Sequence, residues 1–332
     1  MSCASALIDR HGRAIRYLRI SVTDRCDLRC RYCMSEKMQF LPRHAVLSLE
    51  EIALIAERFI AGGVNKIRLT GGEPLMRRDM IDLVRRLGAR IGDGLDELTL
   101  TTNGTHLVQH AEALADAGVR RVNVSIDSRD PEVFRHITRH GDVTRVLDGI
   151  AAAQAAGLRV KLNMVALKGL NDGEFASMLA WAVERDMDLT LIETMPLGQI
   201  DEDRADRFVP LGAVLADLQA SFPLVRDSHD SGGPARYWRV EGSTTRLGLI
   251  SPLTANFCAT CNRVRLSTDG KLHMCLGHED SVDLKAAIRD GGLAEVDARI
   301  AEALGAKPER HEFRIERGAA PAVSRHMSVT GG

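Results

Sequence analysis

The stretch YLRISVTDRCDLRCRYC, residues 17–33, joins a strand-like segment to a loop that carries three cysteines. Apolar and polar side chains alternate in its first six residues, which predicts a strand with two different faces. The loop that follows places Cys26, Cys30 and Cys33 at the spacing C-x3-C-x2-C. A structural metal site usually closes with four ligands, so these three thiols leave one ligand unaccounted for.

The composition of the 332 residues is that of an ordinary globular protein, with 45% hydrophobic and 27% charged residues. The formal net charge of −1 gives no support to a nucleic-acid or membrane-surface partner. The N-terminus shows no apolar signal segment, and apolar runs such as residues 175–183 are too short to cross a bilayer. We therefore expect a cytoplasmic protein, in which clustered cysteines serve as metal or redox sites rather than as disulfides.

Strand-like and helix-like segments alternate through the first 198 residues. The helical segments include residues 49–63, where apolar residues recur at helical spacing and a Gly-Gly pair provides a stop, and residues 175–186. Successive strands joined by helices pair in parallel with right-handed crossovers. The six expected strands are Tyr17–Val22, Lys66–Leu69, Glu97–Thr101, Arg121–Ile126, Arg159–Val165 and Asp188–Glu193.

Six strand–helix units are fewer than the eight of a complete barrel, which typically takes ~250 residues. The pattern therefore predicts an α/β fold over residues 1–198, namely a partial (β/α)6 TIM-like barrel. A doubly wound sheet is the other arrangement that fits these units. In either arrangement, functional residues gather at the carboxyl ends of the strands, and the cysteine loop follows the first strand.

The alternation breaks near Gly198, and residues 199–332 are predicted to form a smaller α+β domain that carries a second cluster and a Gly-Gly tail. The stretch DSHDSGGPAR, residues 227–236, is typical of a loop. Four short strand-like pieces follow it and suggest antiparallel pairing, and the turn STDG, residues 267–270, predicts a hairpin from the last two. A helical segment extends from about residue 283 to residue 304.

Two kinds of metal site fit the first cysteine triplet. Zinc would need a fourth Cys or His ligand. A ferredoxin-type cluster would show C-x2-C-x2-C with a further cysteine, whereas the first gap here contains three residues. The position after a strand favours a three-cysteine iron–sulfur cluster, which would leave one iron open for a reactant, and zinc remains the alternative.

The loop CDLRCRYC, residues 26–33, resembles the cluster loop of the radical S-adenosylmethionine superfamily. TGGEP, residues 70–74, resembles the loop of that superfamily that receives the cofactor's amino group, with Glu73 as a local negative charge. The resemblance implies a [4Fe–4S] cluster on the three cysteines, with S-adenosylmethionine on the open iron and Tyr32 beside its adenine. In the superfamily, one electron from the cluster cleaves the cofactor to methionine and a 5′-deoxyadenosyl radical.

A second triplet, Cys258, Cys261 and Cys275, has the spacing C-x2-C-x13-C. On its own this spacing is also typical of a zinc half-site, which His273 or His278 would complete. Two incomplete triplets in one chain favour a second iron–sulfur cluster with an open iron.

The stretch CATCNRVRLSTDGKLHMC, residues 258–275, closely resembles the C-terminal motif of the GTP 3′,8-cyclase family of molybdenum cofactor biosynthesis. The resemblance covers most of the chain through the ordered motifs LRISVTDRCDLRCRYCM, KIRLTGGEPLMRRD, LTTNGT, RRVNVSIDS, VKLNMVALKGLND and LIETMPLG. It implies a second [4Fe–4S] cluster that holds the guanine of GTP, and a terminal Gly-Gly that reaches back to the active site. It also implies contacts with S-adenosylmethionine at Tyr32, Gly72, Ser125 and Met195.

A nucleoside triphosphate is strongly anionic, so its site should gather Arg and Lys side chains around one cavity. Arg19, Arg68 and Lys161 lie inside strand segments, where alternation would point them into the barrel and an unpaired charge would be costly. Arg263 and Arg265 are alternate residues and would share one face of a strand. The family resemblance places these five side chains at the GTP site and adds Thr101 and the main chain of Val264.

One position departs from the family pattern, because some relatives carry an arginine where this chain has Thr190. A phosphate contact at that position is therefore left open. The chain has no G-x-x-x-x-G-K-[ST] loop and hence no P-loop nucleotide site. No side chain is assigned as an acid, base or nucleophile, because the cofactors carry the hard chemistry.

The activity implied by the resemblance is the radical cyclisation of GTP to (8S)-3′,8-cyclo-7,8-dihydroguanosine 5′-triphosphate, with the two clusters facing each other across one chamber. The implied partners are an electron-donor protein, the cyclic pyranopterin monophosphate synthase that accepts the product, and a second copy in a homodimer. One alternative is another radical S-adenosylmethionine enzyme that modifies peptides through an accessory cluster. The other is a non-enzymatic zinc or electron-transfer protein.

Overall fold

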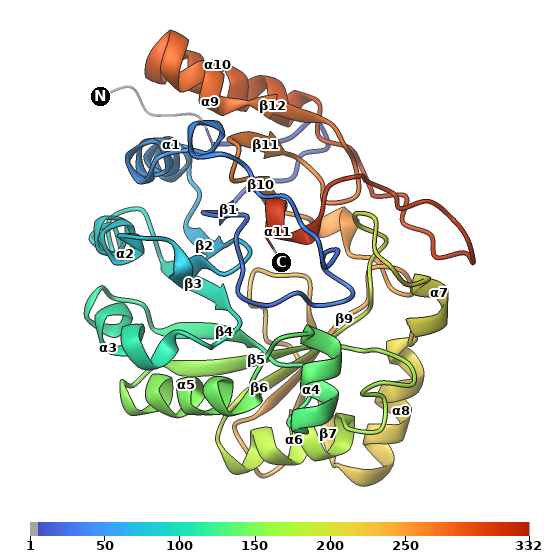
Figure 1. Ribbon diagram of the computed structural model, residues 1–332. Coiled ribbons are helices and arrows are strands. Elements are labelled where there is room, and N and C mark those ends of the chain that lie inside the picture. Colours follow the sequence, from blue (N-terminus) through green and yellow to red (C-terminus); the bar gives the residue numbers. More distant parts are fainter. Residues whose placement is uncertain (1–5, 332) are drawn as a thin grey trace.

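The computed structural model describes residues 6–331, which form a curved sheet of twelve strands with helices on its outer face (Figure 1). The six expected strands are confirmed, and they pair in parallel in chain order. No strand pairing joins β7 to β12 in this part of the chain, so the barrel is partial. The strands are β1 Tyr17–Ser21, β2 Lys66–Thr70, β3 Glu97–Thr102, β4 Arg121–Ser125, β5 Arg159–Val165, β6 Asp188–Ile192, β7 Leu224–Asp227, β8 Arg236–Val240, β9 Arg246–Ile250, β10 Arg263–Leu266, β11 Lys271–His273 and β12 Ser281–Asp283.

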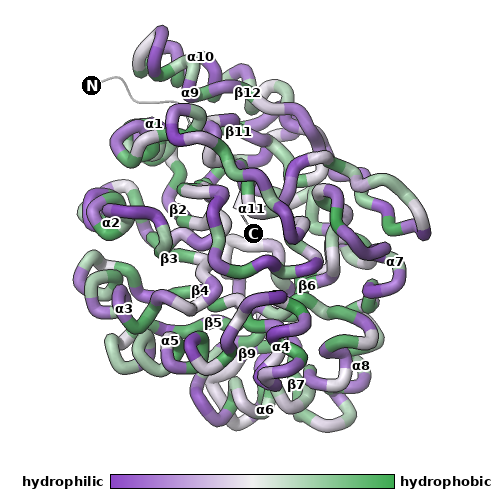
Figure 2. The backbone as a smooth tube through the Cα atoms, in the orientation of Figure 1, coloured by the Kyte–Doolittle hydropathy of each residue, from purple (hydrophilic) through white to green (hydrophobic). Residues whose placement is uncertain are grey.

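Helices form the outer layer, and each contains both hydrophobic and hydrophilic residues (Figure 2). Many of their hydrophobic residues belong to the core that packs on the sheet. At the start of α1, the Ser48 hydroxyl accepts a hydrogen bond from the Glu51 backbone N–H. The Glu51 carboxylate accepts one from the Ser48 backbone N–H. This reciprocal cap fixes the residue at which the helix begins. The expected stop is confirmed, since α1 ends at Ala61 and Gly63 adopts a φ of 92°. The α-helices are α1 Leu49–Ala61, α2 Met80–Gly88, α3 Leu107–Asp116, α4 Pro131–Thr138, α5 Val143–Ala155, α6 Phe175–Glu184, α7 Arg204–Arg207, α8 Leu211–Ser221, α9 Leu284–Ala286, α10 Gly292–Gly305 and α11 Met327–Thr330, and short 3-10 or π turns span Arg43–Ala45, Pro74–Met76, Cys258–Thr260 and Ala287–Gly291.

The two faces of the central strands differ in chemistry. Leu18 and Ile20 of β1 belong to the hydrophobic core under the helices, whereas Arg19 between them lines a cavity on the opposite face. Because successive side chains of a strand point to opposite faces, the same alternation places Arg68 of β2 and Lys161 of β5 in that cavity. The interior of an ordinary TIM barrel is packed with branched apolar side chains, so a cationic interior is a functional feature.

The C-terminal strands do not form a sheet of their own. The hairpins β8–β9 and β10–β11 are antiparallel, as expected. However, β9 also pairs in parallel with β6, and β10 pairs in parallel with β1. These parallel pairings were not predicted, and they form because the free edges of β1 and β6 offer unpaired backbone groups to the two strands. The domain boundary after residue 198 stays a prediction.

The C-terminal tail runs into the middle of the molecule, where Figure 1 shows the C-terminus beside α11. α11 contacts β1, and the Arg265 guanidinium donates a hydrogen bond of 2.7 Å to the carbonyl of Gly331. The second glycine of the tail, Gly332, lies outside the described residues. None of the helices in the described part of the chain combines the length and apolar character needed to cross a membrane.

Candidate active site

The first cysteine loop is docked on the TGGEP loop that follows β2. The backbone N–H of Gly72 donates to the Thr23 carbonyl at 2.7 Å, and that of Glu73 donates to the Arg25 carbonyl at 2.8 Å. A Cβ atom at Gly72 would lie 2.3 Å from the Arg25 carbonyl oxygen, so only glycine allows this approach. The close contact explains why a glycine pair stands at this strand end.

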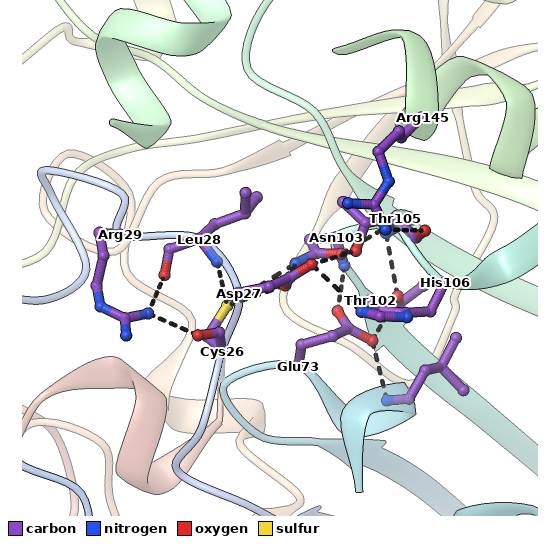
Figure 3. A network of polar contacts seen from close by, with 12 residues as sticks. Cys26, Asp27, Leu28, Arg29, Glu73, Thr102, Asn103, Thr105, His106 and Arg145 are labelled. Carbon is purple, nitrogen blue, oxygen red and sulfur yellow. Dashed lines mark hydrogen bonds and ion pairs between the residues drawn. The ribbon is translucent and has the colours of Figure 1, made fainter. Parts of the chain in front are cut away.

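A polar network around Asp27 fixes the start of the cysteine loop (Figure 3). The Asp27 carboxylate accepts hydrogen bonds of 2.7 Å from Asn103 and from Thr105, both of which follow β3. The Cys26 thiol in turn accepts from the backbone N–H of Leu28 at 3.4 Å. The ends of β1 and β3 therefore share in holding the first triplet.

The Glu73 carboxylate, the local negative charge expected at this loop, accepts hydrogen bonds from within the protein. The side chain is fully buried, and its oxygens accept hydrogen bonds from the Thr102 hydroxyl and from the backbone N–H groups of Leu75 and Asn103. Burial raises its pKa to about 7. In this structure Glu73 joins the ends of β2 and β3 (Figure 3).

The surroundings of the first triplet are unfavourable for bare thiolates. Burial, followed by the charge of Asp127, raises the pKa of Cys30 well above its ordinary value. Burial raises the pKa of Cys33 to about 12, and it raises the pKa of Cys26 as well. The three thiols are close enough to influence one another's ionisation. Three neighbouring thiols that need a positive partner have the donor chemistry of an iron–sulfur cluster.

The four residues assigned to S-adenosylmethionine by resemblance do not all lie together. Gly72 contacts the cysteine loop, as described above. The Tyr32 hydroxyl donates to the Asp127 carboxylate at 2.7 Å, and Ser125 ends β4 two residues before Asp127. Met195 lies further along, in the wall of the central cavity. Three of the four therefore lie close to the first triplet or to its neighbour Asp127.

The second triplet lies where η3, Cys258–Thr260, meets the hairpin of β10 and β11. Cys258 is buried, and burial raises the pKa of Cys275. Burial would also raise the pKa of Cys261, but the charges of Arg263 and Lys307 outweigh it and lower that pKa. Throughout residues 6–331, no group of three or more His, Cys, Asp or Glu side chains is arranged to hold a single metal ion.

A central chamber brings the second triplet and the expected phosphate ligands together. All three cysteines of the second triplet line it, and so do five basic side chains from four strands: Arg19, Arg68, Lys161, Arg263 and Arg265. The other two residues expected at this site do not line it. Thr101 has a buried hydroxyl with no hydrogen-bond partner among the described residues, and the Val264 side chain is in the core.

The basic side chains of the chamber repel one another in a buried setting. Burial, followed by the charge of Arg265, lowers the pKa of Arg19 well below its ordinary value. Burial, followed by the charges of Arg121 and Arg68, does the same to Lys161. Gathering buried positive charges is costly unless an anion binds among them. The chamber therefore has the electrostatics of a polyanion site.

Two further residues of this chamber region, Tyr17 and Lys66, were not expected. Tyr17 lines the chamber, and its buried hydroxyl has no hydrogen-bond partner in the described structure. The Lys66 Nζ lies 5.2 Å from the Tyr17 ring centroid and pairs with Glu97 at 2.5 Å. Tyr17 and Lys66 stand two residues before Arg19 and Arg68, so the same alternation would have found them.

The loop between β7 and β8 closes one end of the chamber. Lys66 donates a hydrogen bond of 2.6 Å to the Ser231 carbonyl. Lys161 donates to the Tyr237 hydroxyl at 2.6 Å, and that hydroxyl donates to the Ser231 hydroxyl at 2.9 Å. This loop belongs to the stretch expected to be irregular, but it serves as the floor of the site.

The C-terminal tail lies between the first triplet and the chamber. The Ser328 backbone N–H hydrogen-bonds to the Cys33 thiol, and Met327 lines the chamber. None of the three cysteines of the first triplet lines the chamber. The tail thus reaches the site, as expected, but here it separates the two triplets that were expected to face each other across one space.

Comparison with known families matches the two halves of the chain separately. Residues 20–182 match the radical SAM superfamily, and residues 187–313 match the family described as Molybdenum Cofactor Synthesis C. Among solved structures, Streptococcus suis SuiB bound to S-adenosylmethionine aligns with a TM-score of 0.61 and 12% identity over 83% of this chain and 65% of that chain. The complex of SuiB with its precursor peptide SuiA gives a TM-score of 0.62 at 13% identity, over 90% of this chain and 67% of that chain. At these identities the two structures show the fold alone.

Curated relatives match over almost the whole length. The GTP 3′,8-cyclase of Rhizobium etli (strain CIAT 652) is 58% identical over 99% of this chain and 95% of its own. The GTP 3′,8-cyclase of Erythrobacter litoralis is 56% identical over 99% of both chains. With this identity, the fold and both cysteine triplets in view, the chain belongs to the GTP 3′,8-cyclase family of the radical SAM superfamily.

Proposed function

We propose that this chain converts GTP into (8S)-3′,8-cyclo-7,8-dihydroguanosine 5′-triphosphate, the first step of molybdenum cofactor synthesis. The observation that carries the proposal is the chamber, where five basic side chains, three of them buried, and a three-thiol site line one cavity. A nucleoside triphosphate has the two matching parts, a polyanionic tail for the cations and a base with ring nitrogen and oxygen atoms for an open iron.

The basic side chains divide into two sets by their position in the strands. Arg19 of β1 lies in register with Arg68 of β2 on one side and with Arg265 of β10 on the other. Arg263 lies two residues before Arg265 on the same face of β10, close to Cys261. We therefore assign the three-strand row to the phosphates, and Arg263 to the part of the nucleotide nearest the second triplet. Lys161 reaches the same cavity from β5 and adds a further phosphate contact.

The first triplet and the TGGEP loop would hold the [4Fe–4S] cluster and S-adenosylmethionine, which together supply a carbon radical able to remove a ribose hydrogen. The chain's own contribution is to orient these groups and to exclude water. Gly72 admits close backbone approach, and Tyr32 is fixed through Asp127. The tail residues Ser328 and Gly331 would have to shift for the cofactor to reach the chamber from Cys33.

The remaining parts of the proposal concern partners. Reduction of the first cluster calls for an electron-donor protein, and the product would pass to a cyclic pyranopterin monophosphate synthase. Homodimer formation and a cytoplasmic location complete the proposal. The six cysteines in the described residues are all free thiols, which supports a reducing location.

The direct test is an anaerobic reaction of the iron-reconstituted protein with GTP, S-adenosylmethionine and dithionite, followed by chromatography that separates the product from GTP and by mass spectrometry. The expected result is 5′-deoxyadenosine together with a cyclic nucleotide that has the mass of GTP. Formation of 5′-deoxyadenosine with no change in GTP would contradict the proposed substrate. That outcome would favour the alternative of a radical enzyme acting on a peptide.

A further inference from the structure

Three cationic side chains from distant parts of the sequence converge on the second triplet. Arg13 donates a hydrogen bond of 2.9 Å to the carbonyl of Cys258. Arg325 donates one of 3.2 Å to the carbonyl of Cys275. The ammonium group of Lys307 lies 3.8 Å from the sulfur of Cys261. Each cysteine of the triplet therefore has a positively charged side chain at its backbone or its sulfur.

Lys307 differs from the two arginines because it has no carboxylate partner. Arg13 forms an ion pair with Asp9 at 2.6 Å, and Arg325 forms one with Glu279 at 2.7 Å. The described residues provide no such partner at ion-pair distance for Lys307, although only 1% of this residue is exposed. The charges of the two arginines are thus locally balanced, whereas that of Lys307 is not.

The three donors of the Lys307 ammonium are all used at the second triplet. Besides the Cys261 sulfur, it donates to the Arg263 carbonyl at 2.9 Å and to the Met274 carbonyl. Arg263 begins β10, two residues after Cys261, and Met274 directly precedes Cys275. The lysine therefore ties together the two segments that carry two of the three thiols.

A buried ammonium without a carboxylate needs another anion close by. The sulfur atoms of the second triplet are the groups in a position to supply that charge, since that of Cys261 lies within 3.8 Å of the ammonium group. A four-iron cube on three thiolates is anionic, and it gains one more negative charge on reduction. A fixed positive charge beside it stabilises the reduced form more than the oxidised form.

We propose that Lys307 is a positioning residue for the second triplet, which it orders through two backbone carbonyls, and that its unbalanced charge makes the iron–sulfur centre there easier to reduce. The inference rests on the second cluster of the proposed function. It concerns the reduction potential and not the binding of GTP.

The test is an EPR-monitored redox titration of the full-length reconstituted protein with dithionite and mediators. Lys307→Met removes the charge at nearly constant size, and Lys307→Arg retains the charge. We expect the potential of the second centre to shift downward in Lys307→Met and to stay close to the unsubstituted value in Lys307→Arg. The potential of the first centre serves as the internal control and should not move.

Repeating the titration with Cys26, Cys30 and Cys33 replaced by Ala isolates the signal of the second centre. An unchanged potential in Lys307→Met with full iron content would overturn the proposal. Loss of the second centre from both lysine variants would also overturn it, because shape rather than charge would then be decisive. If the unsubstituted protein held no second centre, the proposed function itself would fail, and iron analysis shows this before any variant is made.

Discussion

The two cysteine triplets offer the same number of thiols, but the neighbouring charges that act most strongly on Cys30 and on Cys261 have opposite signs. At the first triplet, burial and then the carboxylate of Asp127 raise the pKa of Cys30 well above its ordinary value. At the second, burial of Cys261 is outweighed by the positive charges of Arg263 and Lys307, which lower its pKa. The first triplet is docked on the TGGEP loop, whereas the second lines the cationic chamber.

The difference in neighbouring charge would allow two iron–sulfur centres of the same type to perform different tasks. A carboxylate beside a cluster disfavours the uptake of an electron, so Asp127 would make a centre held by the first triplet a stronger reductant. Positive surroundings favour both thiolate formation and an anionic ligand, which suits a centre that anchors a substrate. We infer that the first triplet supports electron transfer to S-adenosylmethionine and that the second supports binding of GTP.

The largest expected effect comes from removing one thiol from each triplet in turn. Cys30→Ala should abolish both 5′-deoxyadenosine formation and GTP conversion, a greater loss than the ~10–100-fold caused by changes outside the ligands of a metal site. Cys261→Ala should abolish GTP conversion but leave measurable, uncoupled 5′-deoxyadenosine formation. Chromatography of anaerobic reactions measures both products. Equal loss of 5′-deoxyadenosine formation in the two variants would contradict the proposed division of tasks between the two triplets.

The next effect concerns the cations on the side of the second triplet. Arg263→Ala should lower kcat/KM for GTP by about tenfold to a hundredfold, because a hydrogen bond to a charged group contributes roughly 1.5–3 kcal/mol. Uncoupled cleavage of S-adenosylmethionine should persist. Arg263→Lys keeps the charge, and Arg85→Ala removes an arginine whose side chain is 61% exposed on α2. A loss of the same size in Arg85→Ala would show that the effect is not specific to the chamber.

A smaller effect tests the negative surroundings of the first triplet in the metal-free protein. Burial raises the pKa of Asp127 from 3.8 to about 6, so the folded state binds more protons than the unfolded state between these values. The stability contributed by this group is present at low pH and is lost as the pH rises through 6, by about 3 kcal/mol at most.

Asp127→Asn removes the titrating group and should flatten this dependence. Urea denaturation at pH values on both sides of 6 measures the difference in the free energy of unfolding between the variant and the unsubstituted protein. The exposed Asp116→Asn is the matched control. If Asp127→Asn kept the full slope, the pKa assigned to this carboxyl would be wrong.

The smallest effect is expected at Thr190, which lies in β6 and is not among the residues that line the chamber. Its buried hydroxyl has no hydrogen-bond partner among the described residues. Thr190→Val removes this unsatisfied group at nearly constant volume, so stability should be unchanged or slightly higher. We expect kcat/KM for GTP to change by less than about twofold, whereas a loss above about tenfold would reveal a phosphate contact.

The sequence was sufficient to predict the central strands and the cationic face, because both depend on local alternation. Arg19 and Arg68 lie in the chamber where their strand positions put them. The parallel pairing of β9 with β6 and of β10 with β1 was missed, since pairing between distant strands leaves no local pattern.

The contacts that give the triplets their different surroundings could not be predicted from the sequence either. Lys307 is thirty-two residues after Cys275 in the chain, and no sequence pattern connects it with the second triplet. Glu73 was correctly placed at a strand end, but its burial and its hydrogen bonds to the end of β3 were not predicted. Charge near a site depends on tertiary burial, which spacing alone does not specify.

The most direct test of the account is anaerobic iron and zinc analysis of the unsubstituted protein and of two variants, one with each triplet replaced by alanine. We predict about eight iron atoms per chain, four for each cube, and about four in either variant. Zinc in place of iron at either triplet, or loss of all iron from both variants, would contradict the existence of two independent three-thiol centres.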